Sequence, residues 1–190
     1  VLAANHTGSA NGFVIADVNL GTGRLLKGIT TAANGSLTLH VGDNSAPNGP
    51  EYSPATMTFS GGTFTSAYYG VQVADVKHIN NDAPVNYITR YWDITRSGTF
   101  GGSLNYTFNG TYTSADINGT EASSISGRWN GTSWTTGAAL NANTLSITGL
   151  NTMPAVIQYS AGEPLMAQER NVCQGVTTYT SGGPAFNFGN

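Results

Sequence analysis

The sequence has very few charged residues. Lys, Arg, Asp and Glu make up only 9% of the 190 residues, against roughly 25% in an ordinary soluble domain. The formal net charge is -3, and the seven Lys and Arg are scattered along the chain rather than clustered. Because contacts with phosphate groups need clustered cations, we expect no nucleic-acid partner.

Long apolar runs, cysteine pairs and familiar catalytic motifs are also missing. No apolar run approaches the roughly 18 residues of a membrane-spanning helix, so we expect no membrane insertion. Cys173 is the only cysteine, which excludes an internal disulfide and a cysteine-based zinc site but assigns Cys173 no role. His6, His40 and His78 are isolated, and neither a Gly-x-Ser-x-Gly elbow nor a His-Glu-x-x-His pair occurs. We therefore expect no enzyme, no catalytic or metal-binding residue and no cofactor.

Ser, Thr, Asn and Gly replace the missing charges, and these residues fit strands and turns better than helices. Apolar residues alternate with polar ones in runs such as "SLTLHV" and "SLNYTFNG", a period typical of strands. Turn-forming clusters separate the runs, among them "SGG" at Ser60, "NNDAP" at Asn80 and "SGTFGG" at Ser97. The pattern predicts an all-β fold, an antiparallel β-sandwich of Ig-like or jelly-roll-like type with about 8–10 strands.

The pattern changes near residue 162. We expect residues 1–162 to form the sandwich and residues 163–190 to form a linker and a terminal strand, since "VTTYTS" and "AFNF" are strand-like. Such a strand could add to an unpaired sheet edge of a neighbouring subunit as an assembly contact, or could complete its own sandwich. The chain starts at Val1, as a processed or excised segment would, and its composition favours an extracellular location.

One aromatic-rich segment, "YITRYWDITRSG", holds three of the few charges. In one interpretation Arg90 and Asp93 form a catalytic or ligand-binding pair. In the other the charges serve the architecture, with Arg90 covering Trp92 or pairing across strands. In a strand Ile88, Arg90, Trp92 and Ile94 share one face and Asp93 lies on the other, so Arg90 and Asp93 cannot form a same-face pair. We favour the architectural interpretation, with Trp92 as a core anchor.

A second polar segment, "YTSADINGTE", places Asp116, Asn118 and Glu121 close together in the sequence. Oxygen ligands at alternating positions before a glycine resemble the start of a calcium loop, but the full twelve-residue pattern is absent. Asn-Gly is also a strong hairpin turn signal. We predict a turn that does not require calcium.

Trp129 and Trp134 bracket the short turn "NGTS". If both rings faced solvent, they could form a platform for carbohydrate. Trp is highly buried on average, so we favour one Trp packing inward from each arm of a hairpin.

The order of several motifs resembles a known family. "LHVGD", "YSPATMTF", "YITRYWDIT", "YTSADINGTE", "RWNGTSW" and "NTLSITGL" follow one another over about residues 36–162. The succession is similar to that of β-sandwich modules in large secreted and surface proteins of Bacteroidota, the cargo of the type IX secretion system. His40 stands where such modules often have Pro, and no C-terminal sorting domain is visible.

The resemblance implies an extracellular structural or adhesive module and carries no catalytic residues. Its expected partners are further copies of itself, as in a surface filament, neighbouring domains of a surface protein, or a cell-surface glycan. The alternative is a carbohydrate-binding module attached to a secreted enzyme, which would require solvent-facing Trp residues.

Overall fold

The computed structural model describes residues 9–10, 12–29, 35–45 and 49–163, and it confirms the all-β fold. Thirteen strands and three single-turn 3-10 helices occur in these residues, more strands than expected because several are only two or three residues long. In chain order the elements are β1 (Val14–Ile15), η1 (Val18–Leu20), β2 (Leu25–Ile29), β3 (Gly35–Leu39), β4 (Val41–Asp43), β5 (Glu51–Tyr52), β6 (Ala55–Ala74), β7 (Tyr87–Ile88), β8 (Tyr91–Thr111), η2 (Ser114–Asp116), β9 (Ile117–Asn118), η3 (Glu121–Ser123), β10 (Ile125–Trp129), β11 (Trp134–Ala139), β12 (Thr144–Leu150) and β13 (Ile157–Gly162).

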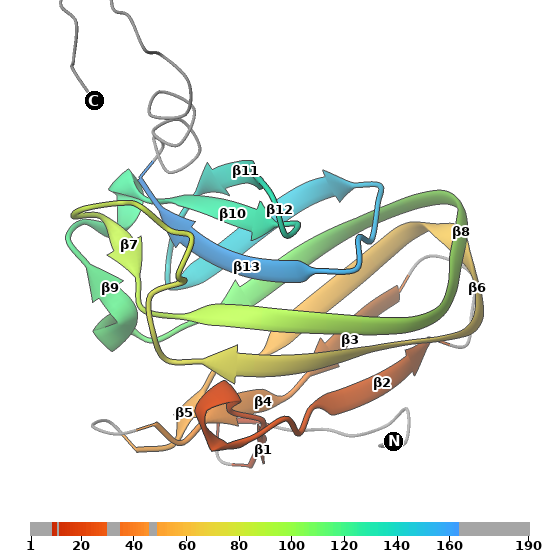
Figure 1. Ribbon diagram of the computed structural model, residues 1–190, viewed down its shortest axis with the longest axis horizontal. Helices are drawn as coiled ribbons and strands as arrows, with labels where there is room; N and C mark the ends of the chain where they lie inside the picture. The colour runs from red at the N-terminus through yellow and green to blue at the C-terminus, as the bar shows by residue number, and fades with distance from the viewer. Residues whose placement is uncertain (1–8, 11, 30–34, 46–48, 164–190) are drawn as a thin grey trace, which may run out of the picture.

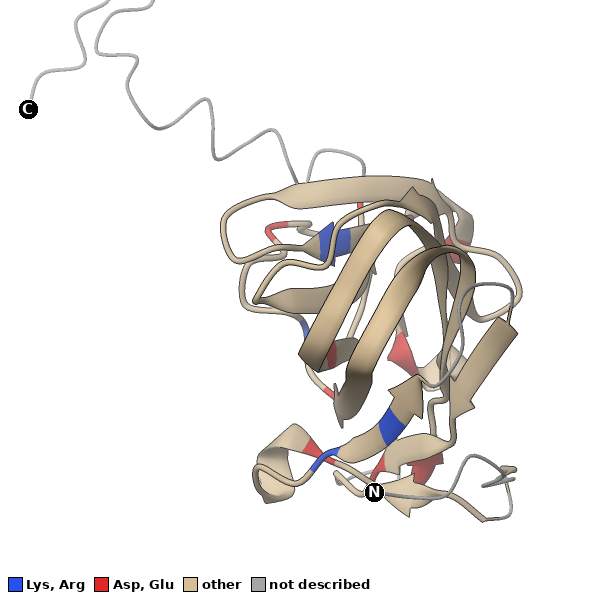
Figure 2. Cartoon of the chain, turned by 90° about the vertical axis from the view of Figure 1, so that its right-hand side faces the viewer, with Lys and Arg blue, Asp and Glu red and all other residues tan. Residues whose placement is uncertain are grey.

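A long antiparallel ribbon made of β6 and β8 organises the sandwich (Figure 1). The two strands pair from Ala55 opposite Gly110 to Ala74 opposite Tyr91. The ribbon turns over at one end of the molecule, where the stretches of the two strands that face the viewer in Figure 2 carry no charged residue. Each strand therefore contributes to both layers of the sandwich.

The two layers grow outward from the two halves of this ribbon. One layer has the order β11-β10-β13-β8-β6-β2, and in the other β12 pairs with the end of β8 while β3 pairs with the start of β6. Side chains of the two layers meet in the core: the rings of Phe108 and Tyr159 stack at a centroid distance of 3.7 Å. Trp92, Tyr69 and Tyr106 are also fully buried there.

Two expected turns are instead bends within the long strands. The "SGG" cluster at Ser60 lies inside β6, and "SGTFGG" at Ser97 lies inside β8, where the register of the pair shifts three times. Gly98 has φ +78°, and a Cβ there would lie 2.2 Å from the carbonyl oxygen of Ser66. Glycine therefore allows the ribbon to turn over without a break in pairing, which is the role that β-bulges and glycines often have in strongly bent sheets. The "NNDAP" cluster at Asn80 does lie in a loop, residues 75–86.

A small sheet of β1, β4 and β5 closes one side of the sandwich. The Val73 amide donates to the Ala16 carbonyl at 2.7 Å, which fixes this sheet beside the end of β6. Asp43 pairs with Glu51 across β4 and β5. Both carboxylates are thereby brought toward the loop that follows β6.

None of the helices in the described ranges is long and apolar enough to cross a membrane. The expected linker and terminal strand over residues 163–190 lie outside the described residues, Glu163 excepted, as do His6 and Cys173.

Candidate functional site

The charged segment that stands out in the sequence places Arg90 in the centre of a buried ionic cluster. The expected continuous strand is interrupted at Thr89 and Arg90, between β7 and β8. Ile88, Trp92 and Ile94 still point into the core, and the Arg90 side chain is fully buried. The interruption lets the guanidinium group reach carboxylates from several parts of the chain.

Four carboxylates surround the guanidinium group of Arg90. Its Nε donates to the Asp116 carboxylate at 2.8 Å, while Nη1 and Nη2 form hydrogen-bonded ion pairs with Asp43 and Glu51 respectively. Asp75 lies 3.9 Å from Nη2. We call Arg90 and these four acids the Arg90 cluster. It ties together β4, β5, the end of β6, the β7–β8 junction and η2, which are far apart in the sequence.

The charges in the Arg90 cluster do not balance, since one guanidinium faces four acids. Burial alone would lower the pKa of Arg90, but the hydrogen bonds and charges of Asp116 and Asp43 outweigh it and hold that pKa above the usual arginine value. Burial raises the pKa values of Glu51 and Asp75, and the neighbouring acids add to this effect although Arg90 opposes it. Glu51 and Asp75, the two carboxyl groups nearest to solvent, are therefore the members of the cluster that most readily hold a proton and so relieve the excess negative charge.

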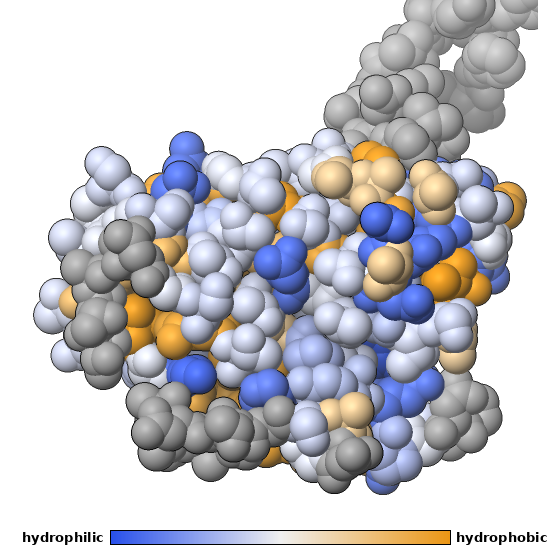
Figure 3. Space-filling view, turned by 180° about the vertical axis from the view of Figure 1, so that it is seen from behind, coloured by the Kyte–Doolittle hydropathy of each residue, from blue (hydrophilic) through white to orange (hydrophobic). Residues whose placement is uncertain are grey.

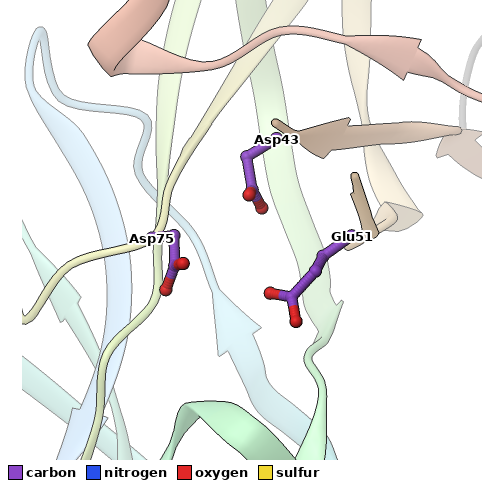
Figure 4. Close-up of side chains that lie close together, drawn as sticks. All are labelled: Asp43, Glu51 and Asp75. Atoms are coloured by element: carbon purple, nitrogen blue, oxygen red, sulfur yellow. The ribbon is translucent and has the colours of Figure 1, made fainter. Parts of the chain in front are cut away.

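Three of these acids have oxygen ligands close enough to share a cation. One carboxylate oxygen from each of Asp43, Glu51 and Asp75 lies within 4.8 Å of the others, and Figure 4 shows the three side chains reaching toward a common space. Oxygen donors of this kind suit Ca²⁺ or Mg²⁺. Arg90, however, already donates to Asp43 and Glu51, so the chain itself supplies a cation to this group.

The raised pKa of Glu51 predicts how the stability of the Glu51→Gln variant should depend on pH. A carboxyl group with a raised pKa holds its proton more tightly in the folded protein, so its stabilising contribution is complete below the usual pKa of about 4.3. That contribution is lost as the pH rises through the higher pKa of the folded state. Glutamine does not titrate, so we expect the melting temperature of Glu51→Gln to gain on that of the parent protein between about pH 5 and pH 8, by a few degrees.

The measurement is a set of thermal melts of parent and variant across this pH range. Asp82→Asn serves as the matched control, because Asp82 is an exposed carboxylate outside the Arg90 cluster. A difference between parent and Glu51→Gln that stays constant with pH would show that the proton on Glu51 does not affect folding.

Comparison with known proteins gives no match: no family model, no curated protein and no solved structure is found to be similar to the chain. The function is therefore argued from the geometry of the described residues.

The structure does not bring together Arg90 and Asp93, the two residues that the sequence analysis considered as a possible pair. Arg90 and Asp93 do not interact; Asp93 instead forms an ion pair with Arg24 of the segment before β2. Asp116 accepts hydrogen bonds from Arg90 and Thr113. These contacts agree with the architectural interpretation of the charged segment.

The segment considered as a calcium loop has its oxygen atoms engaged elsewhere. The Asp116 carboxylate belongs to the Arg90 cluster, whereas Glu121 accepts from the Tyr112 hydroxyl at 2.6 Å and from the Asn143 amide at 2.7 Å. Asn118 is exposed and pairs with Tyr87 in a short bridge between β9 and β7. The two carboxylates thus stabilise different loops.

The two Trp residues of the β10–β11 hairpin lie opposite each other and are largely buried, with 7% and 9% of Trp129 and Trp134 exposed. They form a small cluster apart from the main core, with ring centroids 5.4 Å apart. They therefore pack inward, as favoured, but against each other and His78 rather than into the main core. A flat carbohydrate platform made of these two rings does not fit this burial.

Sequence reasoning missed Asp43, Glu51 and Asp75 as members of a site. Asp43 ends β4, Glu51 begins β5, and Asp75 directly follows the long strand β6. Single acids are common at the ends of strands, so these positions are uninformative. One available signal was Arg90 itself, since an arginine between Ile88 and Trp92 on a buried face needs buried acids as partners.

Proposed function

We propose that the chain is a non-enzymatic structural or adhesive module of a secreted or cell-surface protein. Its partners in this proposal are further copies of the module, neighbouring domains or a surface glycan. The likeness of its motifs to Bacteroidota surface modules supports an extracellular location and export by the type IX secretion system as parts of the same proposal.

The Arg90 cluster is the observation that carries this proposal. A general acid or base must come within hydrogen-bonding distance of its substrate. Asp43 and Asp116 are buried and hydrogen-bonded to Arg90, and the side chains of Glu51 and Asp75 are only 10% and 12% exposed. The densest group of acids in the described residues is therefore built to join segments of the fold, which is what a load-resistant module needs.

The surface supports the same function. The face shown in Figure 3 is mostly of intermediate hydropathy, with hydrophobic side chains in small separate groups. Hydroxyl groups line parts of the sheets: Ser36 and Thr58 lie 2.7 Å apart across β3 and β6, and Thr38 and Thr56 lie 2.9 Å apart. A surface of this kind offers hydrogen bonds to neighbouring modules or glycans without strong charge.

The carbohydrate-binding alternative lacks the feature on which it depended. It required solvent-facing Trp residues, and Trp129 and Trp134 are over nine-tenths buried. The structural or adhesive function is therefore the one that the geometry favours.

Sedimentation and electron microscopy of the full chain test the proposal. We expect concentration-dependent oligomers or ordered polymers, and no turnover of oligosaccharide or peptide substrates. Glu51→Gln and Asp75→Asn are the matched variants for the turnover assay, because they neutralise the two most exposed acids of the Arg90 cluster. A turnover that these variants abolish while the fold is retained would make the cluster an active site and contradict the proposal.

A further inference from the structure

A pocket of about 350 Å³ opens beside the loop of residues 75–86, on the side of the sandwich away from the ribbon's turn. It is lined by Val76, Lys77, His78, Ile79, Tyr91 and Gln158. The same loop exposes three large aliphatic side chains: Val76 is 48% exposed, Ile79 is 89% exposed and Val85 is 54% exposed. Single exposed hydrophobic residues are ordinary, but three on one short loop, two of which (Val76 and Ile79) line the pocket, indicate a surface that another group covers.

The floor of the pocket is held rigidly in place. The His78 ring packs edge-on against Tyr91 at 5.1 Å and Trp134 at 4.9 Å between centroids, and its Nε2 lies 2.9 Å from Gln158 Oε1. The Trp134 Nε1 donates to the Asn80 carbonyl at 2.9 Å, which fixes the loop from below. Of the polar lining residues, His78 and Gln158 contact each other, and the apolar surface comes from Val76, Ile79 and Tyr91. Such a lining suits an apolar or aromatic ligand.

Lys77 lines the pocket, but its ammonium group contacts other residues. Lys77 Nζ donates to the Ala83 carbonyl at 2.5 Å and lies 4.2 Å from the centroid of the Tyr87 ring. The lysine therefore stabilises the loop itself, and the pocket does not select for an anion.

The chain after β13 begins beside this loop. Asn81 Nδ2 donates to the Ala161 carbonyl at 2.9 Å, and Asn86 donates to the Glu163 carboxylate through its backbone N at 3.0 Å and its Nδ2 at 2.7 Å. Figure 1 shows the end of β13 next to β7, which follows the loop. Glu163, the last described residue, therefore lies beside the second half of the loop whose first half lines the pocket.

The sequence after Glu163 contains an apolar group of the right kind. From residue 171 onward it has no Lys, Arg, Asp or Glu, and it includes "PAFNF", with Phe186 and Phe188. Glu163 and Phe186 are close enough in the sequence for the reach to suffice: a random coil of that length has a typical end-to-end distance of about 25 Å. Tethering at that distance gives an effective concentration near the millimolar range, so even a weak pocket would be occupied.

We propose that this pocket is the docking site for the Phe186–Phe188 segment of the same molecule. A phenyl ring enters between Ile79 and Tyr91, and Val76 covers it from the side of the loop. The inference is independent of whether the module polymerises, because the segment and its pocket belong to one chain.

The test is the NMR chemical shift of the Ile79 δ-methyl group in the full chain. A docked phenyl ring should move this resonance upfield by ring current, and the Phe186→Ser/Phe188→Ser double variant should return it toward the unshifted position. Tyr179→Ser is the matched control, since Tyr179 is an aromatic residue of the same segment outside "PAFNF", and it should leave the shift unchanged. Adding a "GPAFNFGN" peptide to the double variant should restore the upfield shift.

Three results would overturn the inference. An Ile79 resonance that does not respond to the double variant, or responds equally to Tyr179→Ser, means that no Phe186–Phe188 contact exists. A shift that disappears on hundredfold dilution means that the ring comes from a second copy and not from the same molecule. Thermal melts of the double variant are the control: if they are unchanged, a loss of the shift reflects undocking and not unfolding of the sandwich.

Discussion

Replacing Arg90 with Met should destabilise the protein by about 3–5 kcal/mol, because removing one partner of a buried ionic network leaves the others uncompensated. Asp43 and Asp116 are buried acids that pair with the positive charge of Arg90. Burial already raises the pKa values of Glu51 and Asp75. The melting temperature should fall by roughly 6–20 °C for a domain of this size. Chemical denaturation, read by Trp fluorescence, measures the loss directly.

Matched variants separate this effect from a general loss of a long side chain. Arg96→Met removes an arginine of the same strand whose side chain is exposed, and it should change stability by no more than about 0.5 kcal/mol. Adding Asp43→Asn and Asp116→Asn to Arg90→Met should restore part of the loss, since the two most deeply buried uncompensated charges are then removed. If Arg90→Met does not fold, Arg90→Lys offers a milder test: it keeps the charge but lacks the planar set of three nitrogen atoms from which the guanidinium group reaches separate carboxylates. Equal stability of Arg90→Met and Arg96→Met would contradict the structural role of the cluster.

Trp92→Ala should cost about 3–5 kcal/mol, as truncation of a large core residue typically does. Trp92 is fully buried, its ring meets Phe108 edge-on at 5.9 Å, and its Nε1 donates to the Ser53 carbonyl at 2.9 Å. The variant therefore loses core packing between the layers and leaves a buried carbonyl without its donor. Tyr68→Ala, which truncates a more exposed aromatic residue of β6, should cost clearly less.

Gly110 makes the Trp92 prediction more specific. A Cβ at Gly110 would lie 2.7–2.9 Å from three atoms of the Trp92 ring, so the ring rests on the backbone at the other end of the same strand. Gly110→Ala should destabilise the parent protein by about 1–3 kcal/mol through overpacking. In the Trp92→Ala background the added methyl group fills vacated space, so the cost should shrink or reverse. Independent, additive effects of the two changes would mean that the ring does not contact Gly110.

The sequence predicted the fold class because alternation and turn composition act locally. It also identified Trp92 as a core anchor, since an aromatic residue on the same strand face as Ile88 and Ile94 is expected to be buried with them. It did not predict that β6 and β8 would continue through "SGG" and "SGTFGG". Glycine and serine favour both tight turns and bulges, and only the pairing of the two strands decides between them.

The Arg90 cluster could be predicted only in part. The sequence left two roles open for Arg90, a catalytic or ligand-binding one and a structural one. The strand face on which Arg90 lies indicated that Asp93 was not its partner. The actual partners come from four other segments, and no local pattern relates Asp43, Glu51 and Asp75 to one another. Their proximity depends on the small β1-β4-β5 sheet closing against the end of β6, which is a tertiary contact.

Hydrogen exchange of the Arg90 Nε–H group, followed by ¹⁵N NMR in the purified protein without added metal, tests the central claim that these charges serve the architecture. The Arg90 Nε–H group donates to Asp116 at 2.8 Å in a fully buried position, whereas Arg96 is exposed. We predict that the Arg90 proton exchanges only when the whole domain unfolds, at the rate of the slowest backbone amides of β8. The Arg96 proton, whose bond to the Pro154 carbonyl is long (3.4 Å) and exposed, should exchange much faster. Exchange of the Arg90 proton as fast as that of Arg96, or protection that arises only after a divalent cation or an oligosaccharide is added, would contradict the account and make the cluster a ligand site.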